Sequence, residues 1–147
     1  MTGGNRDTVL AFWEALYRRD WDAIAAAFTD DAFYEDVASP DLGARGPDAI
    51  VKRLRLGLEP IESYTHDLHH LVVDGDLAFV EHTETWGWHT GESVALRFVS
   101  VMELHDGLIT RWSDYWDLQT LLGAAPPWWI EHITTAYAAD PFDAENK

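Results

Sequence analysis

The fold is decided by residues 77–117, LAFVEHTETWGWHTGESVALRFVSVMELHDGLITRWSDYWD, which predict three consecutive antiparallel strands. The stretch is rich in Val, Phe, Thr and Trp, which favour strands, and turn residues interrupt it at Gly91-Glu92 and Asp106-Gly107. Side chains two residues apart in a strand share a face. One face of each strand can therefore be read from the sequence, and together the three faces carry a His and two carboxylates among apolar and indole side chains. The side chains on these faces are Ala78, Val80, His82, Glu84, Trp86 and Trp88, then Val94, Leu96, Phe98, Ser100, Met102 and Leu104, then Thr110, Trp112, Asp114 and Trp116. If the three faces point the same way, they form a Trp-lined concavity suited to chemistry on a small apolar molecule.

The composition indicates one compact domain with many aromatic side chains. At 147 residues the chain is long enough for one core and too short for two. Hydrophobic residues make up 47% and aromatic residues 13%, which is typical of globular and not of disordered proteins. The eight Trp residues indicate an aromatic pocket or interface, with a purely structural core as the alternative.

The charge balance excludes several classes of partner. Lys and Arg total 10 against 26 Asp and Glu, so the net charge of −16 repels nucleic acid and anionic lipid surfaces. The chain has no Cys, which excludes disulfides, thiolate nucleophiles and zinc-thiolate sites. No apolar run approaches the ~18 residues of a membrane span, and the N-terminus lacks the apolar core of a signal peptide. A cytoplasmic protein that binds neither nucleic acid nor membrane is therefore expected.

The rest of the sequence predicts helices and further strands around this meander. A first helix follows a cap at Asn5 or Asp7, and Asp20 caps a second, short helix. The other expected elements are a strand over 32–37, a loop over 39–47, a helix over 48–58, a strand over 61–73 and a last helix over 127–139. We expect the last helix to pack on its own domain, with a cover over the pocket or a subunit contact as alternatives.

This order of elements predicts an α+β fold. Helices that precede an antiparallel meander can cover the concave face of a curved sheet and leave a cone-shaped cavity, which is a common ligand site. Residues 1–147 are expected to form a single domain, with a core over about 7–122 and a loose tail over 140–147.

Several segments resemble the limonene-1,2-epoxide hydrolase family, within the nuclear-transport-factor-2-like (cystatin-like) fold. Besides the paired N-terminal helices, they are DDAFYEDV at 30–37, RGPDAI at 45–50, FVEHTE at 79–84 and, most specifically, ITRWSDYWD at 109–117. The superfamily also includes ketosteroid isomerases, scytalone dehydratases and polyketide cyclases. The resemblance implies this fold, a homodimer and hydrolysis of an epoxide without a cofactor.

The resemblance also implies roles for five residues. In such hydrolases an Asp on the last strand takes a proton from water, a second Asp protonates the epoxide oxygen, and an Arg between them holds both. Asp114 stands at the position of the base, Glu84 at that of the acid and His82 at that of the Arg. Tyr34 and Asp36 stand where a Tyr and an Asn position the water. The substrate pocket is expected to be lined by Trp86, Trp88, Trp112, Trp116, Phe98, Met102 and Phe12.

The residue types themselves suit this chemistry. Water is a poor nucleophile and an alkoxide a poor leaving group, so epoxide hydrolysis needs a base and an acid together. Two carboxyl groups can fill these roles if one is ionised and the other protonated. Crowding them in an apolar pocket raises the pKa of at least one, so that the two differ in protonation. The alternative is that His82 and Glu84 face solvent while Asp114 caps a turn. The Trp side chains on the same faces argue against it.

Other functions stay open. Asp36 stands where a ketosteroid isomerase carries its proton-shuttling Asp, although Phe12 and Ser100 replace that family's oxyanion-binding Tyr and Asp. A dehydratase or cyclase could use His82 with an acid. A binding module without catalysis could use the same pocket, and turnover of any substrate would separate these classes.

The histidines raise the question of a metal. On a regular strand His66 and His70 share a face while His69 opposes them, which is not a converging ligand set. We therefore expect no metal and no cofactor. The expected partner is a small hydrophobic substrate with a terpene-like, steroid-like or aromatic body.

Overall fold

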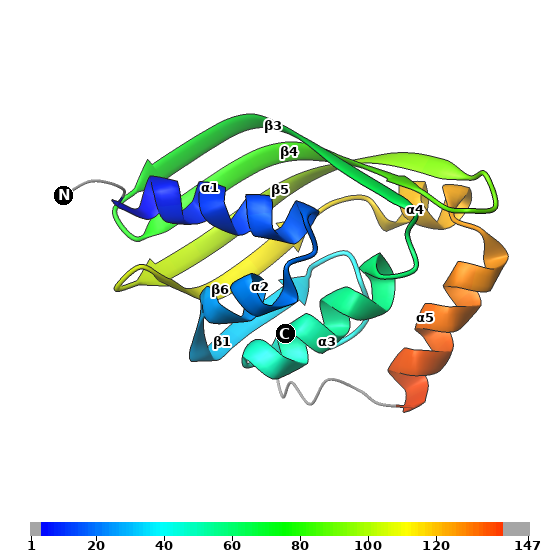
Figure 1. Ribbon diagram of the computed structural model, residues 1–147, viewed down its shortest axis with the longest axis horizontal. Coiled ribbons are helices and arrows are strands. Elements are labelled where there is room, and N and C mark those ends of the chain that lie inside the picture. The colour runs from blue at the N-terminus through cyan, green and yellow to red at the C-terminus, as the bar shows by residue number, and fades with distance from the viewer. Residues whose placement is uncertain (1–3, 140–147) are drawn as a thin grey trace.

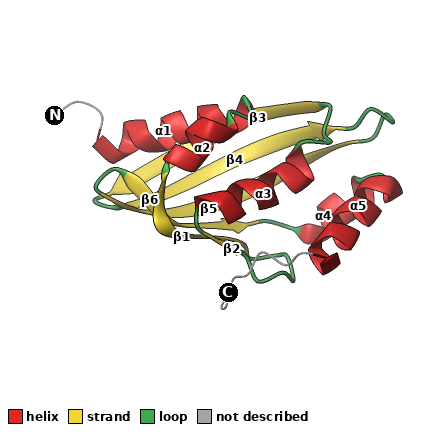
Figure 2. Cartoon of the chain, turned by 60° about the horizontal axis from the view of Figure 1, so that its bottom comes forward, coloured by secondary structure: helices red, strands yellow, loops and turns green. Residues whose placement is uncertain are grey.

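The computed structural model describes residues 4–139, which form a curved six-stranded sheet with helices on its concave side (Figure 1). The helices are α1 (Gly4–Tyr17), α2 (Trp21–Ala26), α3 (Pro47–Leu58), α4 (Leu118–Ala124) and α5 (Pro127–Ala139). The strands are β1 (Phe28–Asp36), β2 (Ala44–Arg45), β3 (Ser63–Asp74), β4 (Leu77–Gly87), β5 (Ser93–His105) and β6 (Leu108–Tyr115). Figure 2 shows α1, α2 and α3 across the hollow of the sheet and α4 and α5 at one end. The predicted α+β class is confirmed, while the expected loose tail lies outside the described residues.

The four long strands form the predicted meander. The sheet order is β2-β1-β6-β5-β4-β3, and β3 to β6 pair antiparallel with their neighbours in sequence. Burial alternates along β5 so strictly that all six side chains predicted for the inner face, from Val94 to Leu104, are buried. Local turns and a period of two therefore suffice to place this face against the core.

The first residues of β6 depart from strict alternation. Leu104 pairs with Ile109 and Glu103 pairs with Arg111, so Thr110 is the extra residue of a β-bulge. Ile109 consequently lies in the core, whereas Thr110, predicted on the inner face, is half-buried and donates from Oγ1 to the carbonyl oxygen of Glu103 at 3.2 Å. Beyond the bulge, the inner face of β6 follows the prediction.

Strand β1 pairs parallel with β6 and begins earlier than predicted, because Phe28 pairs with Ile109. Its register places Asp36 directly beside Asp114. The segment predicted as a loop contains the two-residue strand β2, which pairs with β1. Gly43 precedes it at φ +88°, where a Cβ would lie 2.6 Å from the backbone oxygen of Tyr34, so this turn requires glycine.

Helix α3 carries a charged residue on its buried side. The helix begins at Pro47, one residue before the predicted start, and its buried residues include Ile50, Leu54 and Leu58. Arg53 belongs to the same buried set, with 4% of its surface exposed, whereas Val51 is half-buried and not part of it. A guanidinium group is therefore directed toward the interior of the molecule.

Helix α5 packs on its own domain and also contributes to the pocket. Trp129 is buried and donates from Nε1 to the carbonyl oxygen of Gly57 in α3 at 3.0 Å. The short helix α4 before it was not predicted. Within residues 4–139, no helix is both long and apolar enough to cross a lipid bilayer.

Candidate active site

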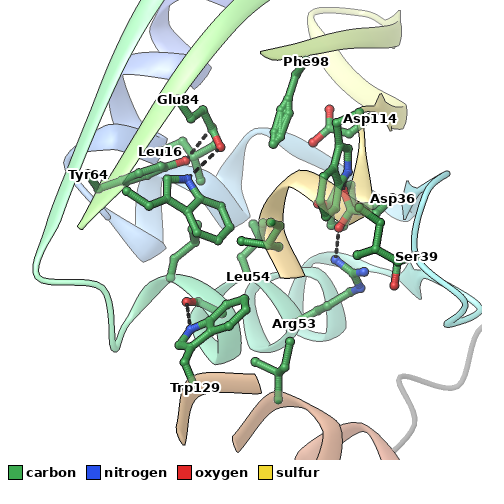
Figure 3. A pocket seen from close by; sticks show the side chains of 18 of the residues that line it. Leu16, Asp36, Ser39, Arg53, Leu54, Tyr64, Glu84, Phe98, Asp114 and Trp129 are labelled. Carbon is green, nitrogen blue, oxygen red and sulfur yellow. Dashed lines mark hydrogen bonds and ion pairs between the residues drawn. The ribbon is translucent and has the colours of Figure 1, made fainter. Parts of the chain in front are cut away.

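A cavity of about 100 Å³ lies between the concave face of the sheet and helices α3, α4 and α5. Its walls are mostly aromatic and aliphatic, and its polar side chains gather at two places. Figure 3 shows Glu84 and Asp114 entering from two sides with Phe98 between them in this view, and Arg53 below Asp36. The cavity therefore combines an apolar body with separate acidic groups, as expected for a small-molecule site.

Asp114 is held by one of its two carboxyl oxygens. Oδ1 accepts hydrogen bonds from Ser100 Oγ at 2.5 Å and from Trp112 Nε1 at 2.6 Å. Within residues 4–139, Oδ2 accepts none that the structure records. Burial and the nearby carboxylate of Asp36 raise the pKa of Asp114 well above its usual range, against the effect of the two donors.

Glu84 is held by both carboxyl oxygens. Oε2 accepts from Tyr64 at 2.7 Å and from Tyr17 at 2.8 Å, and Oε1 accepts from Trp86 Nε1 at the longer distance of 3.2 Å. Burial raises the pKa of Glu84 to about 7, although these three donors oppose it. A carboxyl group with this pKa exchanges its proton near neutral pH, as a general acid must.

His82 lies behind the cavity wall and not in it. The side chain is fully buried, and Nε2 lies 2.8 Å from Ser100 Oγ, which links it indirectly to Asp114. The structure shows no direct hydrogen bond from His82 to Asp114 or Glu84, because Ser100 lies between the imidazole and the Asp114 carboxyl group. Burial lowers the pKa of His82 to about 3, so the ring is neutral.

Asp36 shares the cationic Arg53 with Asp41. Arg53 Nη1 donates to Asp36 Oδ2 at 2.9 Å, while Nε and Nη2 both donate to Asp41 at 2.8 Å. Trp116 Nε1 donates to the other oxygen of Asp36 at 3.0 Å. Despite burial, the hydrogen bonds and charge of Arg53 lower the pKa of Asp41 to about 2. This cluster is a compensated ion network, and Arg53 has little capacity left to bind an anion.

Tyr34 lies beside this network. Its ring contacts that of Trp112 with centroids 4.0 Å apart and planes tilted by 33°, and the guanidinium carbon of Arg53 lies 4.9 Å from its centroid. Burial and the charge of Asp36 raise the pKa of Tyr34, so its hydroxyl is protonated. Tyr34, Asp36, Glu84 and Asp114, four of the five predicted catalytic residues, therefore lie in the cavity wall.

Four of the seven residues predicted for the substrate wall line this cavity. Trp86, Phe98, Trp112 and Trp116 line the cavity. Trp88, Met102 and Phe12 do not line it but are core residues that other side chains cover, with exposed fractions of 2%, 0% and 2%. Alternation gives the face of a strand on which a side chain lies, but not whether the cavity extends to that point.

Sequence reasoning missed three residues that hold the carboxyl groups. Tyr17 comes from α1 and Tyr64 from β3, and no motif connects either to Glu84. Arg53 did leave a signal, because it lies three residues after Ile50 and beside Leu54, on the apolar stripe of a predicted helix. A charged residue at such a position indicates a buried ion pair.

The other histidines do not form a metal site within the described part of the chain. A register shift between Leu68 and His70 breaks the alternation of β3, so the prediction that His66 and His70 share a face is wrong. His70 Nδ1 instead lies 2.8 Å from Glu81 and His69 Nε2 lies 2.7 Å from Thr83, both exposed pairs.

Comparison with known proteins gives the same picture of the fold. The sequence profile of the SnoaL-like domain matches residues 9–112. Epoxide hydrolase EphG of Mycobacterium tuberculosis is 32% identical over 114 residues, which cover 75% of this chain and 71% of EphG. The solved structure of an LEH-like epoxide hydrolase from M. tuberculosis matches with a TM-score of 0.68 at 26% identity, over 90% of this chain and 94% of that one.

A more distant structure shows the fold alone. A protein of ketosteroid isomerase-like fold from Catenulispora acidiphila, solved in complex with trimethylamine, has a TM-score of 0.71 at 20% identity over 80% of this chain and 90% of that one. The domain profile covers more than half of the chain, and the relatives share its curved sheet. The chain belongs to the SnoaL-like domain family, has the nuclear-transport-factor-2-like fold, and is related within it to epoxide hydrolases.

Proposed function

We propose that this protein is a cofactor-independent hydrolase that opens an epoxide on a small hydrophobic substrate with water activated by a carboxylate. One observation carries the proposal: Asp114 and Glu84 project into the same apolar cavity with complementary hydrogen-bond patterns. The relatedness to proteins described as epoxide hydrolases supports the same reaction.

Asp114 is suited to act as the base in its ionised form, which the donors Ser100 and Trp112 favour and which burial and Asp36 oppose. Its Oδ1 is already fixed by Ser100 and Trp112, so Oδ2 remains to accept a hydrogen bond from a water in the cavity. Withdrawing a proton from that water makes its oxygen nucleophilic as it attacks an epoxide carbon. Asp36 and Tyr34, beside Asp114 on the paired strand, are proposed to position this water.

Glu84 is suited to act as the acid. In the protonated form, Oε2 can remain the carbonyl oxygen that accepts from Tyr17 and Tyr64, while Oε1, with only the long contact to Trp86, carries the hydrogen. That hydrogen passes to the epoxide oxygen as the carbon–oxygen bond breaks. The product is a diol. Return of the proton from Asp114 to Glu84 restores the starting state.

The cavity also restricts the substrate. Its walls offer indole, phenyl and leucine side chains, which suit a terpene-like or steroid-like body. The carboxyl groups outnumber the single guanidinium, which is already paired, so an anionic substrate would be repelled. A neutral epoxide is therefore the proposed substrate class.

Isomerase chemistry centred on Asp36 receives less support. A proton shuttle needs a carboxylate free to accept and release a proton, but both oxygens of Asp36 accept hydrogen bonds, from Arg53 and Trp116. Each oxygen of Asp36 is thus already engaged by a donor.

Turnover of a panel of terpene and steroid epoxides in oxygen-18 water tests the proposal. Mass spectrometry of the products should show a singly labelled diol, and its formation should disappear in Asp114→Asn. If wild type forms no diol from any member of the panel, or if Asp114→Asn forms it at the wild-type rate, the proposal is wrong. Enolisable ketones would then be the next panel.

A further inference from the structure

A chain of hydrogen bonds leads from Asp114 into the core. Ser100 donates its single hydroxyl hydrogen to Asp114 Oδ1 at 2.5 Å, so its contact with His82 Nε2 at 2.8 Å is one in which Ser100 accepts. His82 must then carry its hydrogen on Nε2. Because burial holds the ring neutral, Nδ1 is left as a bare acceptor.

The far side of the imidazole favours the same arrangement. His82 Nδ1 and Trp13 Nε1 are both buried without a hydrogen-bond partner among residues 4–139. Their rings lie 4.6 Å apart between centroids, and an indole nitrogen can only donate. Since Nδ1 has no hydrogen-bond partner among the described residues, no such bond favours a hydrogen on that nitrogen.

We propose that His82 and Ser100 are positioning residues for Asp114: His82 donates to Ser100, and Ser100 donates to Oδ1, so that the ionised carboxylate is favoured and Oδ2 stays directed to the cavity. Hydrogen bonds to a charged acceptor are the stronger kind, and each donor in the chain polarises the next. The role of Asp114 as catalytic base rests on the proposed function. The effect of these hydrogen bonds on its carboxyl group is independent of that function.

His82 itself is not placed to exchange protons with substrate. It is fully buried, lies outside the cavity wall and reaches Asp114 only through Ser100.

The titratable groups around the chain also have to be considered. Those that influence Asp114 are Asp36, Glu84, Tyr34 and Tyr64, and those that influence His82 are His66 and His69. Only Ser100 and Trp112 donate to the Asp114 carboxyl group among these residues and their described neighbours.

Three variants separate donation from other roles of His82. Ser100→Ala removes the link with almost no change of volume. His82→Phe keeps an aromatic ring but has no donor, whereas His82→Gln places an amide N–H at the position of Nε2 and cannot titrate near neutral pH. His70→Leu, at an exposed histidine on β3, is the matched control.

Two measurements are made on each variant. The first is the titration of the Asp114 carboxyl group by carbon-13 NMR of the labelled protein, in which the signal absent from Asp114→Asn identifies it. The second is kcat and KM for diol formation from the best epoxide. We expect Ser100→Ala and His82→Phe to raise the pKa of Asp114 and to lower kcat about 10- to 100-fold, as for loss of a hydrogen bond to a charged group, with little change in KM. His82→Gln should restore most of both losses.

The outcomes are distinct. The proposal is overturned if Ser100→Ala leaves the Asp114 titration unchanged, or if His82→Gln behaves like His82→Phe, because the imidazole would then act other than as a donor. If wild type opens no epoxide, the NMR titration still decides between these outcomes. The titration can then support the hydrogen-bond chain from His82 to Asp114 even though epoxide hydrolysis is rejected.

Discussion

Asp114 and Glu84 are chemically similar side chains in one cavity, but their surroundings differ in which oxygen atoms are occupied (Figure 3). Asp114 has both its donors on Oδ1, whereas Glu84 has two phenol donors on Oε2 and a weaker indole contact on Oε1. The first pattern leaves a lone pair for a water molecule. The second suits a protonated acid whose carbonyl oxygen is fixed. Two carboxyl groups can thus be given opposite roles by the placement of neutral donors.

Their electrostatic surroundings differ as well. Asp114 pairs across the sheet with Asp36, whose charge is balanced by Arg53. Glu84 contacts no cation within the described residues, and its donors are all neutral. Burial is the largest cause of the raised pKa of both carboxyl groups, and the charge of Asp36, the strand neighbour of Asp114, raises both further.

The largest loss of activity is expected for Asp114→Asn. An amide cannot take a proton from water, and loss of a general base typically lowers kcat by about 10²–10⁴-fold. The fold should persist, because the amide fills the same volume and a buried carboxyl group that lacks a cation is removed. Steady-state turnover and thermal unfolding check this together. Comparable activity in the variant would remove Asp114 from the mechanism.

Glu84→Gln should cause the next largest loss, about 10²-fold in kcat, because the amide cannot transfer a proton to the epoxide oxygen. In wild type the acid must be protonated, and the pKa of Glu84 is raised to about 7. Activity should therefore fall as the pH rises through about 7. The residual activity of the variant should lack this alkaline decrease. A pH profile of kcat for both proteins tests the sign, and an unchanged profile would assign the decrease to another group.

Tyr64→Phe should have a smaller effect with a defined direction. The hydroxyl donates to Glu84 at 2.7 Å and favours its ionised form, so removing it should raise the pKa of Glu84 further. The alkaline decrease of activity should then move to higher pH, with a change in maximal kcat of only a few fold. Tyr17→Phe is the matched variant, since Tyr17 donates to the same oxygen at 2.8 Å. A shift toward lower pH in either variant would contradict this account.

Most of the fold follows from local signals in the sequence. The meander was predictable because its turns contain glycine and its strands alternate with a period of two. The pairing of β1 with β6, the two-residue strand β2 and the helix α4 were not, since they depend on contacts between distant segments. The bulge at Thr110 and the register shift before His70 likewise break the alternation that sequence reasoning assumes.

The candidate site was likewise predictable only in part. Alternation along β4 and β6 put Glu84 and Asp114 on the inner face, the family resemblance suggested Tyr34 and Asp36, and all four line the cavity. The partners of these groups come from elsewhere in the chain, which is why Arg53 and the two tyrosines were missed. The depth of the cavity was also unpredictable, because helices α1 and α3 decide how much of the concave face stays open. Both Trp86 and Trp88 are buried, but only Trp86 lines the cavity, and Trp88 packs against Trp129 of α5 with ring centroids 5.5 Å apart.

A small effect is also expected at Asp36, and it separates the two enzyme classes. In Asp36→Asn the amide oxygen can still accept one hydrogen bond, and Arg53 keeps both its bonds to Asp41. If Asp36 only helps to position water, diol formation should fall less than about 10-fold, whereas loss of a proton shuttle costs about 10²–10⁴-fold. Asp41→Asn is the matched control, because it weakens the same ion network without changing a group beside Asp114. If Asp36→Asn loses far more activity than Asp41→Asn, Asp36 on β1 is the centre of the chemistry and the Asp114–Glu84 pair is not. The different hydrogen bonding of Asp114 and Glu84 would then serve substrate binding.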